Sequence, residues 1–268
     1  MRYGLIAGSG RFPLLALEMA RSLGHDVVAI GIQEEASKEI EPLCSKCYWI
    51  SLGQLSRLIE ILKLEGLTEV IMAGQVKHTK IFSAIRPDWR LAKLLFSLRE
   101  KNTGALIGGV AKILADEGIA LGDSTRLLKP LLAGEGVLTT RKPDHDEARD
   151  IEYGRRIANT LAGLDVGQSV AIADRACVAV EAMEGTDAML RRAASLVEGK
   201  PLRLVKVARH RRHLLFDVPV AGLNTIDVMQ ETRTTAMAVD AGCTLLLDKE
   251  LMLERANAAG ISIVGALG

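Results

Sequence analysis

Gly8, Ser9 and Gly10 form the first segment whose residue types could do chemistry. They stand between an apolar run and a stretch with helical spacing from Phe12 to Leu23. Glycines allow a tight turn at such a junction, and the free N–H groups of a helix N-terminus bind phosphate oxygens. The segment is therefore a candidate phosphate-binding turn, although a plain strand-to-helix turn explains the same residues.

A second candidate segment contains Gly74, Gln75 and Lys77. It follows the strand-like run Val70–Met72, and ligands of open α/β sheets bind at the carboxyl ends of strands. The ammonium group of Lys77 either neutralises a phosphate there or lies in solvent, as in an ordinary loop lysine. Both interpretations stay open.

The densest group of polar residues is the segment 181–187. Glu181 and Glu184 flank a turn that ends at Gly185, and Thr186 and Asp187 precede an apolar run. Thr and Asp are common N-caps, so the segment predicts the start of a helix. The same free N–H groups would bind a phosphoryl oxygen, and the two interpretations are compatible.

Asp217 lies in a fourth group of residues, which extends to Thr225. It follows an apolar run and precedes an X-Pro step, which favours extended backbone. A carboxylate in this place suits a metal ligand or a general base, and equally a turn cap. The basic stretch that begins at Lys206 is a solvated edge or faces an anionic ligand.

The elements that must position these residues alternate between strand-like and helix-like patterns in both halves. This alternation predicts an α/β fold, with a Rossmann-like N-terminal domain over residues 1–135 and a second α/β domain over 136–268. A breaker-rich stretch from Gly134 marks the boundary, and Asp144 opens an amphipathic helix that runs to about Leu161. We also expect a helix over 232–241.

Composition excludes several classes of protein. The chain of 268 residues has 34 Lys and Arg against 33 Asp and Glu, and only 3% aromatic residues, which argues against nucleic acid as a partner. No apolar run is long enough for a transmembrane segment. Cys44 and Cys47 form a C-x-x-C without a second pair nearby, so incidental thiols in a reducing cytoplasm are expected rather than a zinc or redox site.

The ordered motifs resemble the LpxI type of UDP-2,3-diacylglucosamine pyrophosphatase, a family of lipid A biosynthesis, over essentially the whole length. The matching segments are 4–13 (GLIAGSGRFP), 73–77 (AGQVK), 165–169 (DVGQS), 179–187 (AVEAMEGTD) and 216–219 (FDVP).

The resemblance implies hydrolysis that depends on Mg²⁺, in which water attacks the α-phosphorus and releases UMP and lipid X (2,3-diacylglucosamine 1-phosphate). It implies an active site in the cleft between the two domains, a homodimer, and a cytoplasmic protein with peripheral contact with lipid of the inner membrane. Asp217 is then the candidate catalytic residue, and Asp217 and Asp187 are the candidate metal ligands. The candidate substrate-binding residues are Gly8, Ser9, Gly10, Gly74, Gln75, Lys77, Gly185, Thr186, Lys206 and Thr225.

Two alternatives remain. The family pattern has an acidic pair where this chain has Thr103 and Gly104, and an Asp-x-Arg where it has His213–Leu215, so a divergent relative that binds nucleotide without catalysis, or takes another substrate, is the second hypothesis. A nicotinamide-dependent oxidoreductase is the third. It conflicts with Pro13, which occupies the last glycine position of the G-x-G-x-x-G fingerprint.

Overall fold

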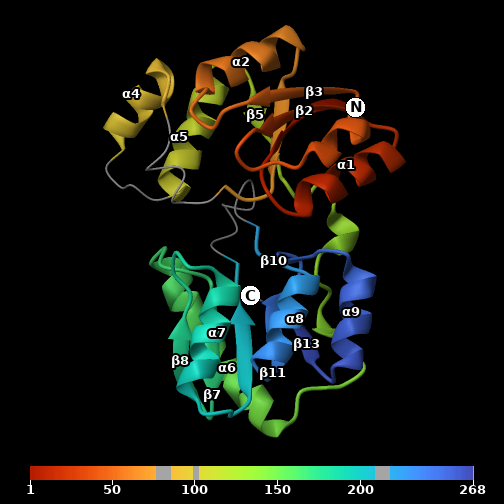
Figure 1. Cartoon of the computed structure of the whole chain (residues 1–268), viewed down its shortest axis with the longest axis vertical. Coiled ribbons are helices and arrows are strands. Elements are labelled where there is room, and N and C mark those ends of the chain that lie inside the picture. Colours follow the sequence, from red (N-terminus) through yellow and green to blue (C-terminus); the bar gives the residue numbers. More distant parts are fainter. Residues whose placement is uncertain (77–85, 99–102, 209–217, 268) are drawn as a thin grey trace. The chain divides into compact units, whose positions relative to one another are not determined.

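The two halves of the chain each build a sheet flanked by helices in the computed structural model (Figure 1). The structure describes residues 1–76, 86–98, 103–208 and 218–267. These form two compact units, Met1–Leu128 and Lys129–Gly268. The chain is therefore an α/β protein, and its Rossmann-like assignment stays a prediction.

The first unit contains a parallel sheet of five strands in the order β3-β2-β1-β4-β5. Its elements are β1 (Arg2–Ala7), α1 (Phe12–Ser22), β2 (Asp26–Ile32), the 3₁₀ helix η1 (Lys38–Leu43), β3 (Lys46–Ile50), α2 (Leu55–Leu64), β4 (Glu69–Ala73), α4 (Trp89–Ser97), α5 (Thr103–Asp116) and β5 (Ala120–Leu121). Helices α2, α4 and α5 pack on one face of the sheet, while α1 and η1 contact the other. Because both faces are covered, β1 and β2 are almost continuously apolar.

Glu65, which ends α2, ties together three elements of the first unit. Its carboxylate accepts hydrogen bonds from Tyr48 Oη (2.5 Å), Lys46 Nζ (2.9 Å) and Arg2 Nη2 (2.6 Å). The Tyr48 hydroxyl, followed by the Lys46 ammonium, stabilises the charged form and lowers the pKa of Glu65 to about 2. The carboxylate therefore fastens the end of α2 to β1 and β3.

We expect Glu65→Gln to lower the unfolding temperature at neutral pH. Because the folded-state pKa of Glu65 lies below the ordinary value of 4.5, its contribution to stability is complete above pH 4.5 and is lost as the pH falls toward 2. The difference in unfolding temperature between wild type and Glu65→Gln should therefore shrink over that interval in a calorimetric pH series. Glu60→Gln, an exposed change in α2, is the control, and a constant difference across the interval would refute the assignment.

The second unit contains a mixed sheet of six strands in the order β6-β13-β11-β9-β7-β8. Its elements are the 3₁₀ helix η2 (Lys129–Leu131), β6 (Gly136–Val137), α6 (His145–Gly163), β7 (Ser169–Ala173), β8 (Ala176–Val180), α7 (Thr186–Leu196), β9 (Leu202–Lys206), β10 (Val220–Ala221), α8 (Leu223–Glu231), β11 (Thr234–Asp240), β12 (Leu245–Leu246), α9 (Lys249–Ala258) and β13 (Ser262–Ala266). Strands β9, β11 and β13 run parallel, and β7 is antiparallel to both β9 and β8.

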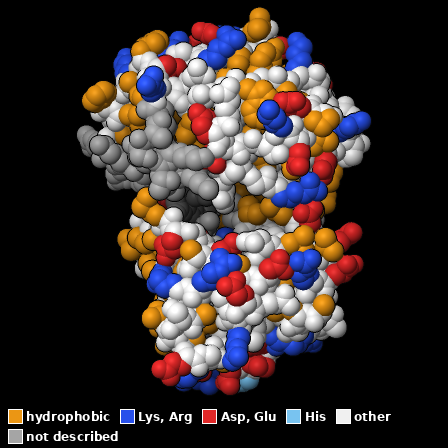
Figure 2. Space-filling view, viewed as in Figure 1, with side chains coloured by type: hydrophobic (Ala, Val, Ile, Leu, Met, Phe, Trp, Pro, Cys, Tyr) orange, Lys and Arg blue, Asp and Glu red, His pale blue; other side chains and the backbone are white. Residues whose placement is uncertain are grey.

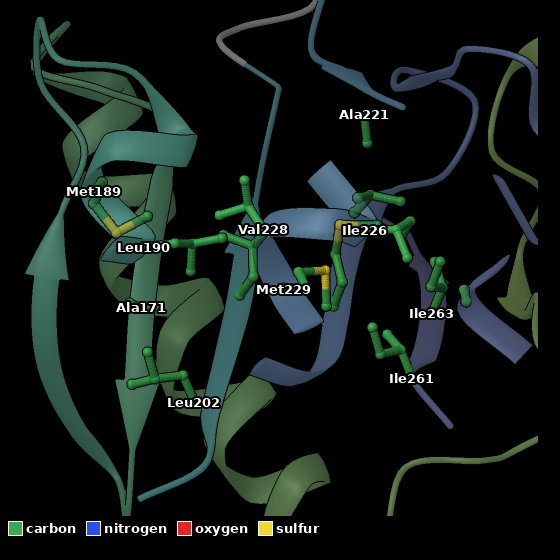
Figure 3. Packing of buried hydrophobic residues seen from close by; sticks show 14 of the residues in the cluster. Ala171, Met189, Leu190, Leu202, Ala221, Ile226, Val228, Met229, Ile261 and Ile263 are labelled. Atoms are coloured by element: carbon green, nitrogen blue, oxygen red, sulfur yellow. The ribbon is translucent and has the colours of Figure 1, made fainter. Parts of the chain in front are cut away.

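Two hydrophobic clusters cover the two faces of this sheet. Helices α7, α8 and α9 share one cluster with the sheet, and α6 packs on the other face. Figure 3 shows Leu190 of α7 beside Val228 of α8 within the larger cluster. The helix expected from Asp144 is confirmed as α6, where Asp144 and Glu147 form a capping box.

The prediction of a helix over residues 232–241 is wrong, because Thr234–Asp240 form strand β11. The helix lies earlier, over Leu223–Glu231. Strand β11 is covered on both faces and contains the apolar run Ala236–Val239, and such a short run has no periodicity that separates a strand from a helix.

Surface charge is mixed on the face that Figure 2 shows, where Lys and Arg alternate with Asp and Glu. This agrees with the formal net charge of +1. Within the described ranges, no helix has both the length and the apolar character needed to cross a membrane.

Candidate functional site

The two glycine-containing segments of the first unit lie against each other at one end of its sheet. Strands β1 and β4 are neighbours, and the strand order reverses at this pair, which is where ligands bind in open α/β sheets. Gly8 N donates to Ala73 O (2.8 Å), and Ser9 and Gln75 exchange backbone hydrogen bonds of 2.8 and 3.1 Å. The structure thus brings together Gly8, Ser9, Gly74 and Gln75.

Glycine is required at two positions of this contact. A Cβ on Gly8 would lie 2.6 Å from Gln75 O, and a Cβ on Gly74 would lie 2.6 Å from Ser9 O. Gly74 also has φ +92°, which L side chains rarely adopt. The close approach of the two turns therefore depends on the missing side chains.

Helix α1 follows directly and carries Pro13 in its first turn. Its N-cap residue makes no side-chain capping hydrogen bond, and helix N-termini are common binding sites for anions. Ser9 Oγ, in contrast, donates to Gln75 O (2.8 Å). Phosphate binding by this turn stays a prediction, and Lys77 lies outside the described residues.

Thr186 is the centre of the candidate site in the second unit. It is the first residue of α7, after Gly185, which has φ +85° and provides no side-chain cap. Thr186 Oγ1 donates to Glu181 Oε1 (2.9 Å) and accepts from Lys206 Nζ (2.9 Å). All three side chains are more than nine-tenths buried, so two opposite charges are held away from water around one hydroxyl.

Two residues of this cluster were given no substrate or metal role from the sequence, although Glu181 was named there as part of the polar segment 181–187. Glu181 follows β8, and Ser169 begins β7, where its Oγ lies 3.2 Å from Thr186 Oγ1. Glu181 N donates to Ser169 O (2.9 Å), and a Cβ on Gly167 would lie 1.8 Å from Glu181 O. For Ser169 the only signal was that it belongs to the segment 165–169, which resembles the family, whereas Glu181 also stands in the polar segment 181–187.

Asp187 and Thr225 lie on adjacent helices whose N-termini are joined. Asn224 Nδ2 donates to Asp187 Oδ2 (2.5 Å), which connects the first turns of α7 and α8. Thr225 Oγ1 accepts from Gly222 N (3.3 Å) and so caps α8. Thr225 is thus engaged in its own helix, a role that the sequence did not predict.

A magnesium site is not formed by the described residues alone. In the ranges that the structure describes, no three His, Cys, Asp or Glu side chains are grouped to hold a metal ion, and Asn224 already occupies one oxygen of Asp187. Asp217 lies outside the described residues, as do His213 and Leu215. The prediction that the active site lies between the two domains is likewise untested.

Glycine-rich turns beside helix N-termini at strand ends are features of α/β proteins that bind phosphate groups, and both units carry them. Residues 2–140 match the model of the LpxI N-terminal domain, and residues 134–264 match that of the LpxI C-terminal domain. The chain belongs to the LpxI family, as the resemblance of its motifs indicated.

The UDP-2,3-diacylglucosamine pyrophosphatase LpxI of Caulobacter vibrioides is 28% identical over 274 residues, which cover 98% of this chain and 97% of the relative.

Similarity to solved structures is low. A biotin carboxylase domain of Hydrogenobacter thermophilus 2-oxoglutarate carboxylase has 12% identity and a TM-score of 0.30, with 72% of this chain and 40% of that chain covered. A UDP-glucose 4-epimerase of Bifidobacterium longum, in complex with NAD⁺ and UDP, has 12% identity and a TM-score of 0.29, with 44% and 35% covered. This chain thus spans less than half of either, and likeness at this level supports no functional argument.

We expect Gly74→Ala to separate the β1 and β4 turns. The new Cβ would meet Ser9 O at 2.6 Å with φ at +92°, so the free energy of unfolding should fall by about 1–3 kcal/mol. Gly108→Ala is the control, because Gly108 lies in α5, where a Cβ meets nothing within 4 Å; it should stabilise the helix by about 0.5–1 kcal/mol. Urea denaturation measures both, and equal stability of the two variants would contradict the proposed role of Gly74.

Proposed function

We propose that this chain hydrolyses the pyrophosphate bond of UDP-2,3-diacylglucosamine, giving UMP and 2,3-diacylglucosamine 1-phosphate in lipid A biosynthesis. The observation that carries the proposal is the match to both LpxI domain models and to the Caulobacter relative along nearly the whole length of both chains.

The reaction needs a nucleophile and charge compensation. Water attacks the α-phosphorus, the bond from this phosphorus to the bridging oxygen breaks, and the β-phosphate leaves with the sugar. Asp217, which occupies the Phe-Asp-x-Pro segment that resembles the family, is the proposed catalytic residue. Mg²⁺ is the proposed cofactor, with Asp217 and Asp187 as its ligands, and when bound it would offset the charge of the pyrophosphate.

The described residues offer the electrostatic part of such a mechanism. Lys206 places an ammonium beside the N-terminus of α7, where the helix dipole and the free N–H groups also favour an anion. Donors fixed before the reaction stabilise developing charge without reorganisation. The turns after β1 and β4 are the proposed second group of substrate contacts.

The substrate also determines where the protein works. Because UDP-2,3-diacylglucosamine carries two acyl chains, we place the protein in the cytoplasm in peripheral contact with the inner membrane. A homodimer is the proposed assembly, as the family resemblance implies.

The alternative is that this chain is a family member that binds nucleotide without catalysis. The observation that favours it is the Thr103–Gly104 pair at the start of α5, where the family pattern has two carboxylates. A protein that binds uridine nucleotide but releases no UMP would support this alternative.

Asp217→Ala should abolish the release of UMP from UDP-2,3-diacylglucosamine, because the proposed activating carboxylate is removed. Turnover is measured by chromatography of UMP, and the unfolding temperature of the variant is measured alongside. Asp227→Ala is the matched control, since Asp227 pairs with Arg255 (2.8 Å) on the surface; it should keep wild-type turnover. Parallel losses of stability and activity in Asp217→Ala would instead assign that residue a structural role.

Chelation should reduce turnover by at least about a hundred-fold, because a divalent cation contributes several kcal/mol of charge stabilisation at a phosphoryl centre. The measurement is UMP release in EDTA, followed by titration with Mg²⁺, which should restore the rate. Turnover that persists in EDTA would contradict the magnesium requirement and leave the hydrolase proposal intact.

A further inference from the structure

The hydrogen-bond roles around Thr186 follow from the chemistry of a hydroxyl. A hydroxyl has one hydrogen to donate and two lone pairs that accept. A carboxylate can only accept and an ammonium can only donate, so Thr186 Oγ1 donates to Glu181 and accepts from Lys206. The remaining contact, with Ser169 Oγ at 3.2 Å, then has Ser169 as the donor. The hydrogen-bonding capacity of the Thr186 hydroxyl is therefore fully used.

Among the described residues, the hydrogen-bonding capacity of its two charged neighbours is not complete. Glu181 is only 8% exposed, and its Oε2 is buried without a hydrogen-bond partner among the described residues. Lys206 is 7% exposed, and of the three N–H groups on its Nζ, one is bonded within the part of the chain that the structure describes. Buried polar groups in folded proteins almost always have partners, so these open positions indicate a bound polar group.

The open positions differ in character, and this limits what can bind. Lys206 and the uncapped N–H groups at the start of α7 offer hydrogens and positive charge, which suit a phosphate. Glu181 Oε2 offers a lone pair and a negative charge, which repel a phosphate but suit a hydroxyl or an N–H. A bare phosphate satisfies only half of this arrangement.

We propose that Glu181 is a specificity-determining residue that accepts a hydrogen bond from a hydroxyl or N–H of a phosphate ester, while the phosphate of that ester contacts Lys206 and the N-terminus of α7. The identification of this ester with part of the substrate rests on the proposed function. UDP-2,3-diacylglucosamine offers two such groups, the nucleotide half and the sugar 1-phosphate half.

The test compares three soluble probes by isothermal titration calorimetry on the full chain: UMP, glucosamine 1-phosphate and inorganic phosphate. In Glu181→Gln only one acceptor oxygen remains, so either Thr186 or the ligand loses its partner. We expect about ten-fold or greater loss of affinity for one ester, and no loss for inorganic phosphate. The ester whose affinity falls identifies which half of the substrate occupies the subsite.

Glu184→Gln is the matched control, because it makes the same chemical change three residues away. Glu184 is exposed, and the Arg192 guanidinium beside it lowers the pKa of its carboxyl. This variant should bind all three probes as wild type does. Should Glu181→Gln fail to fold, Glu181→Asp keeps the charge, withdraws it by one methylene, and should weaken binding of the same ester.

A folded Glu181→Gln, or in its place Glu181→Asp, that binds both esters as wild type does would overturn the proposal. Steady-state kinetics separate the subsite from the reaction, since a recognition role raises KM more than it lowers kcat. Wild-type protein that binds an ester through Glu181 but releases no UMP would overturn the proposed function alone. Normal turnover with an unchanged KM in Glu181→Gln would overturn the subsite alone.

Discussion

One hydroxyl group, Thr186 Oγ1, connects the parts of the second unit on which its candidate site depends. It bonds to residues that begin β7, follow β8 and end β9, and it belongs to the first residue of α7. Without it, a buried carboxylate and a buried ammonium would lose their shared partner, and an unpaired buried charge is strongly destabilising. The geometry of this sheet end therefore depends on a residue type that looks like an ordinary helix cap in the sequence.

Two of the buried glutamates among the described residues, Glu65 and Glu181, differ in how many of their carboxylate oxygens have hydrogen-bond partners. Glu65 in the first unit has hydrogen bonds from three side chains, and both of its oxygens are occupied. Glu181 in the second unit uses one oxygen and leaves the other without a partner among the described residues. A carboxylate with partners on both oxygens connects elements of the fold, whereas a carboxylate with one unpartnered oxygen can accept a hydrogen bond from a ligand.

The sequence predicts those features that depend on local chemistry. The start of α6 follows from Asp144 and the acidic first turn. The start of α7 lies where the sequence predicts it, but its N-cap is Gly185, and Thr186 is the first residue of the helix rather than its cap. Strand β11 was mistaken for a helix because its apolar run is explained by burial on both faces, which only the assembled sheet reveals. Ser169 was missed as a site residue for a similar reason, since strand pairing rather than sequence spacing brings it to Thr186. Glu181 was visible in the polar segment 181–187, but its burial beside Lys206 was not.

The shared burial of Glu181 and Lys206 also restricts how the chain can change over evolutionary time. Removing one charge leaves the other uncompensated, whereas replacing a buried pair together by apolar residues is often neutral. A substitution at either position alone is therefore strongly disfavoured. Whether a substitution at the second position raises or lowers stability depends on whether the first has already occurred. This dependence between two sites twenty-five residues apart is a form of epistasis, created by one threonine that touches them both.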